Sequence, residues 1–193
     1  MRRIGGIVLA AGGSTRLGEP KQLLEFDNET LAHAAVRAAH EGGCDVVCLV
    51  TGHAQTEVEH AVADLNPILA QNQEWQRGMG SSIRIGLSAV SPVSAIVLLA
   101  CDQPAVNGKM IRSLIERYDQ TGRAIIASHY SGTLGIPALF DHSCFAELRA
   151  LADDRGAKAV IQADPARVAS FEFPDGALDL DAPDDLRAWR SRR

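Results

Sequence analysis

The sequence predicts an α/β fold in which helices cover both faces of a mostly parallel β-sheet, giving three layers (αβα). Apolar runs of strand length alternate with stretches of helical period, and this order favours parallel strands joined by right-handed crossovers. The apolar runs are nearly continuous, as in strands that are buried on both faces. The chain has 193 residues and shows no repeat or linker, so we expect residues 1–193 to form one domain.

Six strands and four helices are expected in order along the chain. The strands are expected at Ile4–Leu9, Val46–Val50, Ile68–Ala70, Ala95–Ala100, Ala124–Ser128 and Arg167–Phe171. The helices are expected at Glu29–Glu41, Gln55–Ala63, Ser81–Val90 and Lys109–Gln120. In the first helix, Asn28 can cap the start and Gly42-Gly43 follows the last turn.

The segment His129–Phe140 breaks the alternation of strands and helices. Tyr130-Ser131-Gly132 favours a turn, and Gly135-Ile136-Pro137 favours a short extended piece. We therefore expect a small antiparallel insertion here, near the side of the sheet that binds the ligand.

Charge and hydropathy exclude two classes of partner. The 19 Lys and Arg against 24 Asp and Glu give a net charge of −5, and the basic residues cluster only at Arg190, Arg192 and Arg193. A nucleic-acid-binding protein would show a basic surplus or patch, so no nucleic acid is expected. No apolar run approaches the roughly 18 residues of a membrane span, and no membrane contact is expected.

The four cysteines, Cys44, Cys48, Cys101 and Cys144, show neither C-x2-C spacing nor a pairing with histidine at zinc-site distances. Cys48 and Cys101 lie in apolar runs, where a free cysteine behaves as a small buried hydrophobic residue. Met1-Arg2-Arg3 is followed only by an apolar stretch of strand length, which disfavours a signal peptide. We expect reduced cysteines and a cytoplasmic location.

A glycine-rich segment follows the first strand, at the edge where open parallel sheets bind ligands. It contains Gly12, Gly13 and Gly18, whose small size lets backbone N–H groups approach a phosphate closely. Arg16 and Lys21 add positive charge. The spacing fits neither G-x-x-x-x-G-K-[ST] nor G-x-G-x-x-G. The segment therefore predicts an anion site of another kind, with a plain surface turn as the alternative.

Two aspartates are candidate metal ligands. Asp102 follows the apolar run Ala95–Ala100 by two residues, which places it at the carboxyl end of a strand beside the glycine-rich segment. A carboxylate in that position suits Mg²⁺, although Asp102 could also form a turn with Pro104. Asp181 precedes Ala182-Pro183, where the same carboxylate could cap a helix or bind a metal.

These motifs together resemble those of the MobA-like nucleotidyltransferases, and more closely their molybdenum cofactor cytidylyltransferase branch. Five motifs occur in the family's order over residues 5 to 186. The resemblance implies a three-layer αβα Rossmann-like nucleotidyltransferase fold. The matching strings are Leu9-Ala10-Ala11-Gly12-Gly13-Ser14-Thr15-Arg16-Leu17-Gly18-Glu19-Pro20-Lys21, Asn72-Gln73-Glu74-Trp75 with Gly78-Met79-Gly80-Ser81-Ser82, Asp102-Gln103-Pro104, Gly135-Ile136-Pro137, and Leu180-Asp181-Ala182-Pro183-Asp184-Asp185-Leu186.

The resemblance also implies a role for each motif. Lys21, Arg16 and Asp102 would be catalytic, and Asp102 with Asp181 would hold Mg²⁺. The implied nucleotide-binding residues are Leu9, Ala10, Ala11, Gly12, Gly13, Ser14, Arg16, Lys21, Asn72, Gly78 and Ser82. The implied acceptor-binding residues are Met79, Gly80, Ser81, Gln103, Pro104, Gly135, Ile136 and Pro137.

The implied reaction transfers CMP from CTP to the terminal phosphate of molybdopterin or its molybdenum-loaded form, releases pyrophosphate, and places a molybdoenzyme client downstream. Ala10-Ala11 stands where guanylyltransferase relatives typically have Ala-Gly, and the extra methyl group narrows the pocket in favour of a pyrimidine. One methyl group discriminates by only about 1–3 kcal/mol. The acceptor phosphate has a second pKa of about 6, so it is already ionised and needs no strong base.

Other interpretations of the sequence stay open. The chain could use GTP on the same pterin, act on another phosphorylated small molecule, carry the molybdenum cofactor without catalysis, or be an oxidoreductase, although it lacks G-x-G-x-x-G. Ser81 could simply cap the third helix. Asp153 and Lys158 replace a glycine and an arginine of the family pattern, and an exposed helix start is favoured there.

Overall fold

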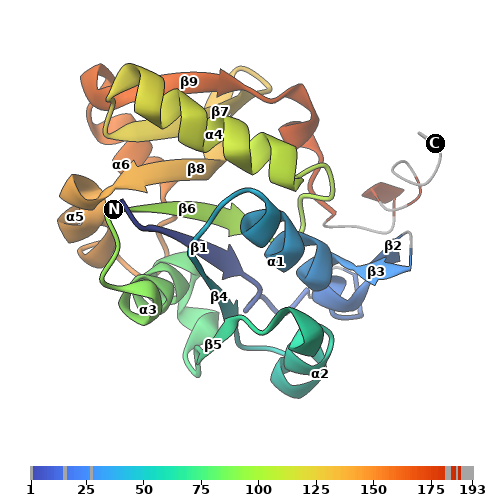
Figure 1. Ribbon diagram of the computed structural model, residues 1–193. Helices are drawn as coiled ribbons and strands as arrows, with labels where there is room; N and C mark the ends of the chain where they lie inside the picture. The colour runs from blue at the N-terminus through green and yellow to red at the C-terminus, as the bar shows by residue number, and fades with distance from the viewer. Residues whose placement is uncertain (1, 15–16, 27, 181–183, 186, 188–193) are drawn as a thin grey trace.

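The computed structural model describes residues 2–14, 17–26, 28–180, 184–185 and 187 (Figure 1). Seven of its strands form one sheet in the order β5-β4-β1-β6-β8-β7-β9. Within this sheet β8 is antiparallel to both of its neighbours, and the other pairs are parallel. The strands of the sheet are β1 (Ile4–Leu9), β4 (Val46–Thr51), β5 (Ile68–Gln71), β6 (Ala95–Ala100), β7 (Ile125–Tyr130), β8 (Thr133–Asp141) and β9 (Val168–Glu172).

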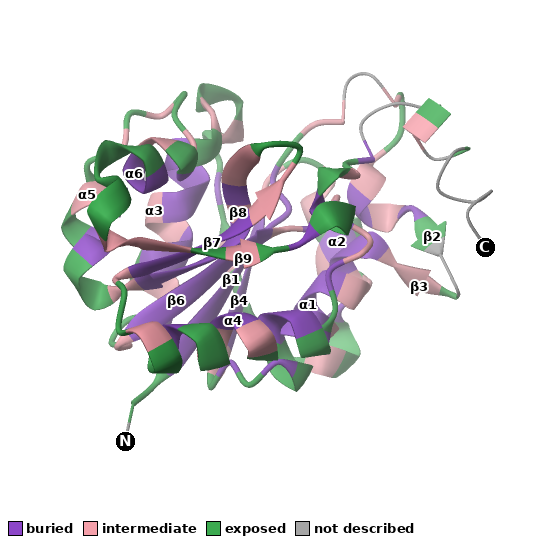
Figure 2. Ribbon diagram, turned by 90° about the horizontal axis from the view of Figure 1, so that it is seen from above, coloured by how far each residue is buried: buried purple, intermediate pink, exposed green. Residues whose placement is uncertain are grey.

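Helices cover both faces of the sheet, as the sequence predicts, and the buried strands lie between them (Figure 2). Successive residues of a strand point to opposite faces. Thus Ile7 belongs to the core cluster on the face covered by α3, α5 and α6, whereas Val8 belongs to the cluster on the face covered by α1 and α4. The α-helices are α1 (Leu31–Glu41), α2 (Gln55–His60), α3 (Met79–Val90), α4 (Gly108–Thr121), α5 (Phe145–Arg149) and α6 (Lys158–Ala163).

Short elements complete the described chain. A separate antiparallel ribbon pairs β2 (Glu25–Phe26) with β3 (Glu29–Thr30). The 3₁₀ turns are η1 (Lys21–Leu23), η2 (Ala63–Leu65), η3 (Trp75–Arg77), η4 (His142–Cys144), η5 (Pro165–Arg167) and η6 (Pro174–Ala177). No helix in this part of the molecule combines the length and apolar character needed to cross a bilayer.

Two predicted helix starts are wrong, for local reasons. Asn28 lies in the turn between β2 and β3 with φ of 63°, and Thr30 caps α1 by accepting a hydrogen bond from the His33 amide at 3.2 Å. Ser81 does not cap α3, because that helix already begins at Met79. The end of α1 is predicted well, since Gly43 adopts the left-handed φ of 99°.

The predicted small insertion is instead a full strand of the central sheet. β8 runs from Thr133 to Asp141 between β6 and β7, and its pairing with β7 shifts register between Ala127 and Ser128. The shift leaves Ile136 and Pro137 out of the ladder, so the missing N–H of the proline breaks no strand pairing. The turn predicted at Tyr130-Ser131-Gly132 does join β7 to β8.

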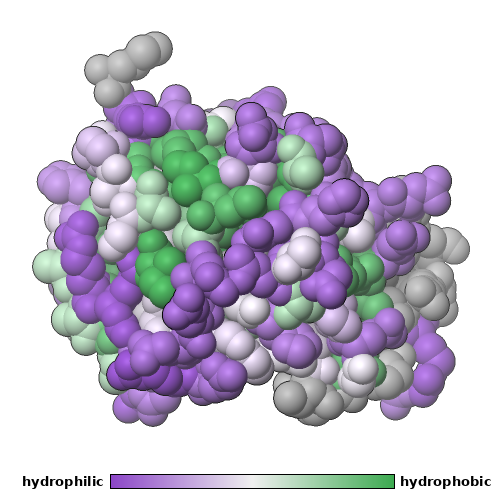
Figure 3. Space-filling view, turned by 90° about the horizontal axis from the view of Figure 1, so that it is seen from below, coloured by the Kyte–Doolittle hydropathy of each residue, from purple (hydrophilic) through white to green (hydrophobic). Residues whose placement is uncertain are grey.

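The edge of the sheet formed by β5 carries exposed apolar side chains. β5 carries Ile68 and Leu69, which are 39% and 47% exposed. Figure 3 views the molecule from the side of α3 and β5 and shows apolar side chains gathered on this face. Neither Ile68 nor Leu69 lines the cavity described below. The four cysteines are all buried and free of disulfide bonds, as expected.

Candidate active site

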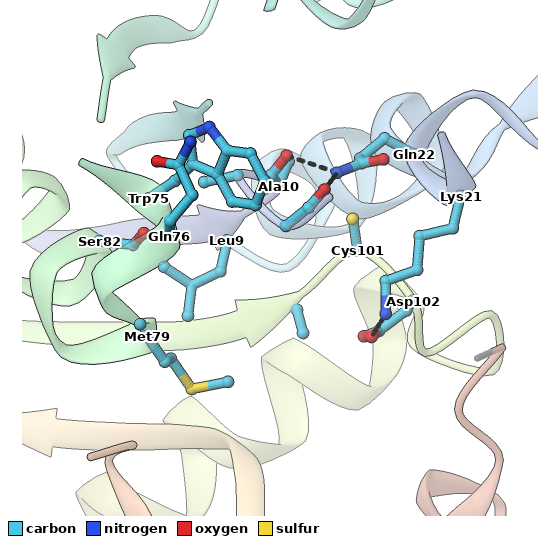
Figure 4. Close-up of a pocket in the computed structure, with 14 residues that line it drawn as sticks. Leu9, Ala10, Lys21, Gln22, Trp75, Gln76, Met79, Ser82, Cys101 and Asp102 are labelled. Atoms are coloured by element: carbon cyan, nitrogen blue, oxygen red, sulfur yellow. Dashed lines mark hydrogen bonds and ion pairs between the residues drawn. The ribbon is translucent and has the colours of Figure 1, made fainter. Parts of the chain in front are cut away.

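A cavity of about 330 Å³ lies at the carboxyl ends of β1 and β6, next to the start of α3 (Figure 4). The same edge is where open α/β sheets place their ligands. The lining residues come from the loop after β1, from η1, from the segment that leads into α3, and from the loop after β6. They are Leu9, Ala10, Ala11, Gly12, Lys21, Gln22, Trp75, Gln76, Gly78, Met79, Ser82, Ala100, Cys101 and Asp102.

The backbone of the loop after β1 leaves hydrogen-bond donors available. The Ala10 amide donates to the Val50 carbonyl at 2.9 Å, and the Ala11 carbonyl accepts from the His53 amide at 3.1 Å. The amides of Ala11, Gly12 and Gly13 donate to no other residue within the described ranges. A run of amides without a protein acceptor forms an anion-binding concavity. The loop can therefore hold a phosphate group.

Trp75 explains why this loop requires a glycine at position 13. A Cβ atom at Gly13 would lie 2.6 Å from Cη2 of Trp75, so no larger residue fits without a shift. The indole ring also lies 5.6 Å from the His53 ring, at an interplanar angle of 57°. Trp75 thus packs against the loop and forms one wall of the cavity.

Lys21 and Asp102 face each other at the opposite side of the cavity. Nζ of Lys21 lies 2.5 Å from Oδ2 of Asp102, and the two side chains are 16% and 18% exposed. The Lys21 amide donates to Oγ of Ser14 at 3.0 Å, and the Asp102 carbonyl accepts from the Leu180 amide at 3.0 Å. A cation and a carboxylate are thereby held next to the free amides of the loop.

Cys101 precedes Asp102 and lines the same cavity, but it supplies no nucleophile. Its side chain is 4% exposed and lines the cavity. Burial, helped by the negative charge of Asp102, raises the pKa of the Cys101 thiol to about 12. The thiol is therefore neutral near pH 7, whereas the reactive form of cysteine is the thiolate.

Asn72 organises the start of α3 rather than lining the cavity. It is 1% exposed, and its Nδ2 donates to Oγ of Ser81 at 2.8 Å and to Oγ of Ser82 at 2.9 Å. Ser81 in turn donates to the Gly78 carbonyl at 2.7 Å. Of these two serines, Ser82 lines the cavity. Since its oxygen already accepts from Asn72, its hydroxyl proton is available to a ligand.

Asp153 fixes the turn that precedes α3. A Cβ atom at Gly78 would lie 2.4 Å from the Asp153 carbonyl, and the Gly80 amide donates to that carbonyl at 2.9 Å. The Asp153 carboxylate pairs with Arg77 at 2.5 Å and also with Arg84. These ion pairs lower the pKa of the Asp153 carboxyl below its usual range, with the hydrogen bond from Arg84 as the main cause. The exposed helix start expected in this stretch lies at its far end, where α6 begins at the exposed Lys158, whereas Asp153 itself lies in a turn.

The acceptor residues predicted on the loop after β6 and on β8 form a supporting layer. Gln103 is 5% exposed, and its Nε2 donates to the carbonyls of Ile136 at 3.2 Å and Gly176 at 3.1 Å. The Tyr130 hydroxyl also donates to the Ile136 carbonyl, at 3.0 Å. The predicted residues that do not line the cavity are Gly13, Ser14, Asn72, Gly80, Ser81, Gln103, Pro104, Gly135, Ile136 and Pro137.

Two predicted residues, Arg16 and Asp181, lie outside the described ranges. Five lining residues were not predicted: Gln22, Trp75, Gln76, Ala100 and Cys101. For two of them the available signal was a predicted neighbour, since Gln22 follows Lys21 and Cys101 precedes Asp102; Trp75 belongs to one of the matched motifs.

Comparison with known proteins agrees with this geometry. The family model of the MobA-like NTP transferase domain matches residues 6–168. The chain belongs to this family. As a MobA-like domain that carries the loop and the Lys21–Asp102 pair described above, it is a nucleotidyltransferase.

Several relatives resemble this MobA-like chain over different lengths. Purine catabolism protein PucB of Bacillus subtilis is 28% identical over 192 residues, which cover 93% of this chain and 92% of PucB. Nicotine blue oxidoreductase of Paenarthrobacter nicotinovorans is 34% identical over 128 residues, 65% of this chain. That match spans 62% of the length of nicotine blue oxidoreductase. A separate match to the bifunctional protein GlmU of Streptomyces coelicolor spans 26% of the length of GlmU.

Solved structures share the fold of the MobA-like chain. Rv0371c from Mycobacterium tuberculosis superimposes with a TM-score of 0.82 at 31% identity, covering 98% of both chains. Rv0371C has also been solved in complex with manganese; that structure superimposes with a TM-score of 0.80 at 30% identity, covering 96% of this chain and 97% of its own. A nucleotidyl transferase from Methanothermobacter thermautotroptrophicus has a TM-score of 0.86 at 23% identity, covering 100% and 98% of the two chains, which shows the shared fold.

Proposed function

We propose that this nucleotidyltransferase transfers CMP from CTP to the terminal phosphate of molybdopterin or its molybdenum-loaded form. The observation that carries the proposal is that the loop of Ala11, Gly12 and Gly13, whose amides have no acceptor among the described residues, shares one cavity with the Lys21–Asp102 pair. A triphosphate on the loop would have its α-phosphate within reach of a cation. An oxygen of the acceptor phosphate would attack the α-phosphorus, the bond between the α-phosphorus and the bridging oxygen would break, and pyrophosphate would leave.

In this proposal each part of the chain has one task. Lys21 contacts the α-phosphate and stabilises the charge that develops on its oxygens. The loop amides, with Arg16, hold the β- and γ-phosphates that leave. No general base is needed, because the acceptor phosphate is ionised at neutral pH and requires in-line positioning. The neutral Cys101 thiol and the histidines have no chemical role.

The donor set fits Mg²⁺. This ion takes only one or two protein carboxylates and otherwise binds water and substrate phosphates. Asp102 supplies such a carboxylate at the cavity wall, and we assign Asp181 as the second ligand. The backbone bond between Leu180 and Asp102 supports that assignment. When bound, Mg²⁺ neutralises the negative charge of the reacting phosphates.

The preference for CTP rests on two alanines of the loop after β1. Ala10 and Ala11 line the cavity and are 2% and 5% exposed. The Ala11 methyl group lies close to Gly52, since a Cβ atom at Gly52 would lie 2.9 Å from it. A methyl group in this position favours the smaller pyrimidine over a purine. The Ser82 hydroxyl can donate to an oxygen or nitrogen acceptor of the base.

A panel of nucleotides and acceptors tests the proposal. The purified protein is mixed with Mg²⁺ and CTP, GTP, ATP or UTP, with molybdopterin as acceptor, and pyrophosphate release is measured. We expect release with CTP that depends on the acceptor. Faster turnover with GTP would replace the cytidylyl assignment with guanylyl transfer. Turnover only with another phosphorylated acceptor would overturn the assignment of molybdopterin as the acceptor. It would also overturn the proposal that a molybdoenzyme client uses the product.

A further inference from the structure

The Gln22 side chain connects the turn that carries Lys21 to the loop after β1. Gln22 lies in η1 and is 1% exposed. Its Nε2 donates to the Ala10 carbonyl at 2.8 Å and to the Gly12 carbonyl at 2.7 Å (Figure 4). Its Oε1 accepts a weaker hydrogen bond from Oγ of Ser14 at 3.4 Å. All three partners belong to the loop after β1, so among the described residues this amide binds only that loop.

The two carbonyls that Gln22 binds determine where the free amides point. In a planar trans peptide the C=O of one residue and the N–H of the next point in opposite directions. When Gln22 holds the Ala10 carbonyl, the Ala11 N–H turns away from Gln22. When it holds the Gly12 carbonyl, the Gly13 N–H turns away as well. These are two of the three amides that have no acceptor within the described part of the chain.

We propose that Gln22 is a positioning residue for triphosphate binding. It holds the loop in one conformation before the ligand arrives, so that the Ala11 and Gly13 amides already face the triphosphate. The same 3₁₀ turn binds the loop a second time, through the Lys21 amide and Oγ of Ser14 at 3.0 Å. The Lys21 ammonium and the loop amides are therefore fixed to each other, and binding needs no rearrangement between them. This inference rests on the proposed function.

The chemistry of the position requires an amide. Two carbonyl oxygens need two N–H donors, and the Gln22 NH₂ group supplies both. A glutamate would place a carboxylate against the two carbonyls, and its neutral form would supply only one donor. Methionine has a similar length and no donor at all. Methionine therefore removes the constraint on both carbonyls, and glutamate removes it except where the protonated form donates to one of them; both preserve most of the side-chain volume.

Binding measurements with three probes test the proposal. The probes are CTP, inorganic tripolyphosphate and cytidine, each titrated into wild type, Gln22→Met and, as a control, Gln120→Met on the exposed end of α4. Loss of the constraint costs about 1.4 kcal/mol or more, so we expect CTP and tripolyphosphate to bind Gln22→Met at least tenfold more weakly. Cytidine should bind all three proteins equally. Equal loss for all three probes, or no loss for tripolyphosphate, would overturn the assignment.

The glutamate variant adds a signature that a purely structural role would not produce. In Gln22→Glu a buried carboxyl has its pKa raised, and only its protonated form can donate to a loop carbonyl. We therefore expect kcat/KM of Gln22→Glu, relative to wild type, to recover as the pH falls from 8 to 6, with the change mainly in KM. Gln120→Glu should track wild type. A pH-independent ratio would contradict the proposal, and this variant decides the test if Gln22→Met fails to fold.

Failure of the inference is distinguishable from failure of the proposed function. If wild type neither binds nor consumes any nucleoside triphosphate, the proposed function is wrong and the inference falls with it. If wild type does both and the Gln22 variants match it, the proposed function stands and the role of Gln22 is wrong.

Discussion

The Lys21 ammonium occupies one face of the Asp102 carboxylate, at 2.5 Å from Oδ2. In the proposed reaction Lys21 binds a phosphate and Asp102 binds a metal ion. In the structure the two side chains bind each other instead. Binding of the nucleotide with its metal must break this ion pair. The pair therefore disfavours binding of the metal alone and couples it to binding of the nucleotide.

Replacement of Lys21 by methionine separates these two roles. Turnover should fall about a hundredfold or more, because loss of one positioned charge contact costs roughly 3 kcal/mol. Without nucleotide, the variant should bind Mn²⁺ more tightly than wild type, since Asp102 has lost its cation. Titration followed by electron paramagnetic resonance measures this, with the exposed Lys109→Met as control. Equal Mn²⁺ affinity in wild type and Lys21→Met would show that the ion pair does not compete with the metal.

The close approach of Gly13 to Trp75 predicts a coupled pair of substitutions. Gly13→Ala would place its Cβ 2.6 Å from Cη2 of Trp75 and push the loop out of position. Overpacking of this kind costs about 1–3 kcal/mol, so nucleotide affinity should fall roughly tenfold. Adding Trp75→Leu removes the obstructing ring and should restore part of that loss. A double-mutant cycle on the CTP dissociation constant measures the coupling, and strictly additive effects would rule out the contact as the cause.

The ion pairs of Asp153 predict a defect at the entrance to α3. In Asp153→Ala, Arg77 and Arg84 lose their shared carboxylate. The Gly78–Gly80 turn should then move, so that KM rises while kcat changes less. Asp153→Glu, which retains the charge, should recover part of the activity. The neighbouring exposed Asp154→Ala is the matched control, and steady-state kinetics that leave Asp153→Ala unchanged would contradict the prediction.

The contact between Tyr118 and Asp141 predicts a pH dependence of stability. Burial alone would raise the pKa of Asp141, but hydrogen bonds from Ser143 and Tyr118 outweigh it and lower that pKa to about 2. Asp141 therefore stabilises the fold above its unfolded pKa of about 4, and this contribution is lost as the pH falls toward 2.

Denaturant unfolding of Asp141→Asn measures this effect. Relative to wild type, the variant should lose about 1–2 kcal/mol of unfolding free energy at pH 7. The difference should shrink between pH 4 and pH 2, because protonation removes the same charge from wild type. Asp154→Asn serves as the control. A difference that stays constant over this pH range would mean that the charge of Asp141 contributes nothing.

The parts of the fold that could be predicted are those whose signal is local. The bounds of β1 and β6 match the prediction because both are continuous buried apolar runs. The antiparallel direction of β8 was predicted, but its length was not, because Gly135 and Pro137 are typical of loops and the strand continues past them through a register shift with β7. Pairing between distant segments leaves little trace in composition.

In the candidate site, too, the residues with a local sequence signal could be predicted and the others could not. Lys21 and Asp102 could be predicted because each follows a strand and carries a charge in an apolar or glycine-rich context. The roles of Gln22 and Trp75 could not be predicted, because these roles lie in contacts with the loop after β1. Asn72 was predicted as a ligand-binding residue, and the structure gives its side chain to Ser81 and Ser82.

Because all four cysteines are buried, the molecule offers a clean background for thiol labelling. A cysteine introduced in place of the exposed Gln73, two residues before Trp75, would carry an accessible thiol while the four native thiols stay buried. The fluorescence intensity of a maleimide dye attached there would report ligand binding, and none of the native cysteines would need to be replaced.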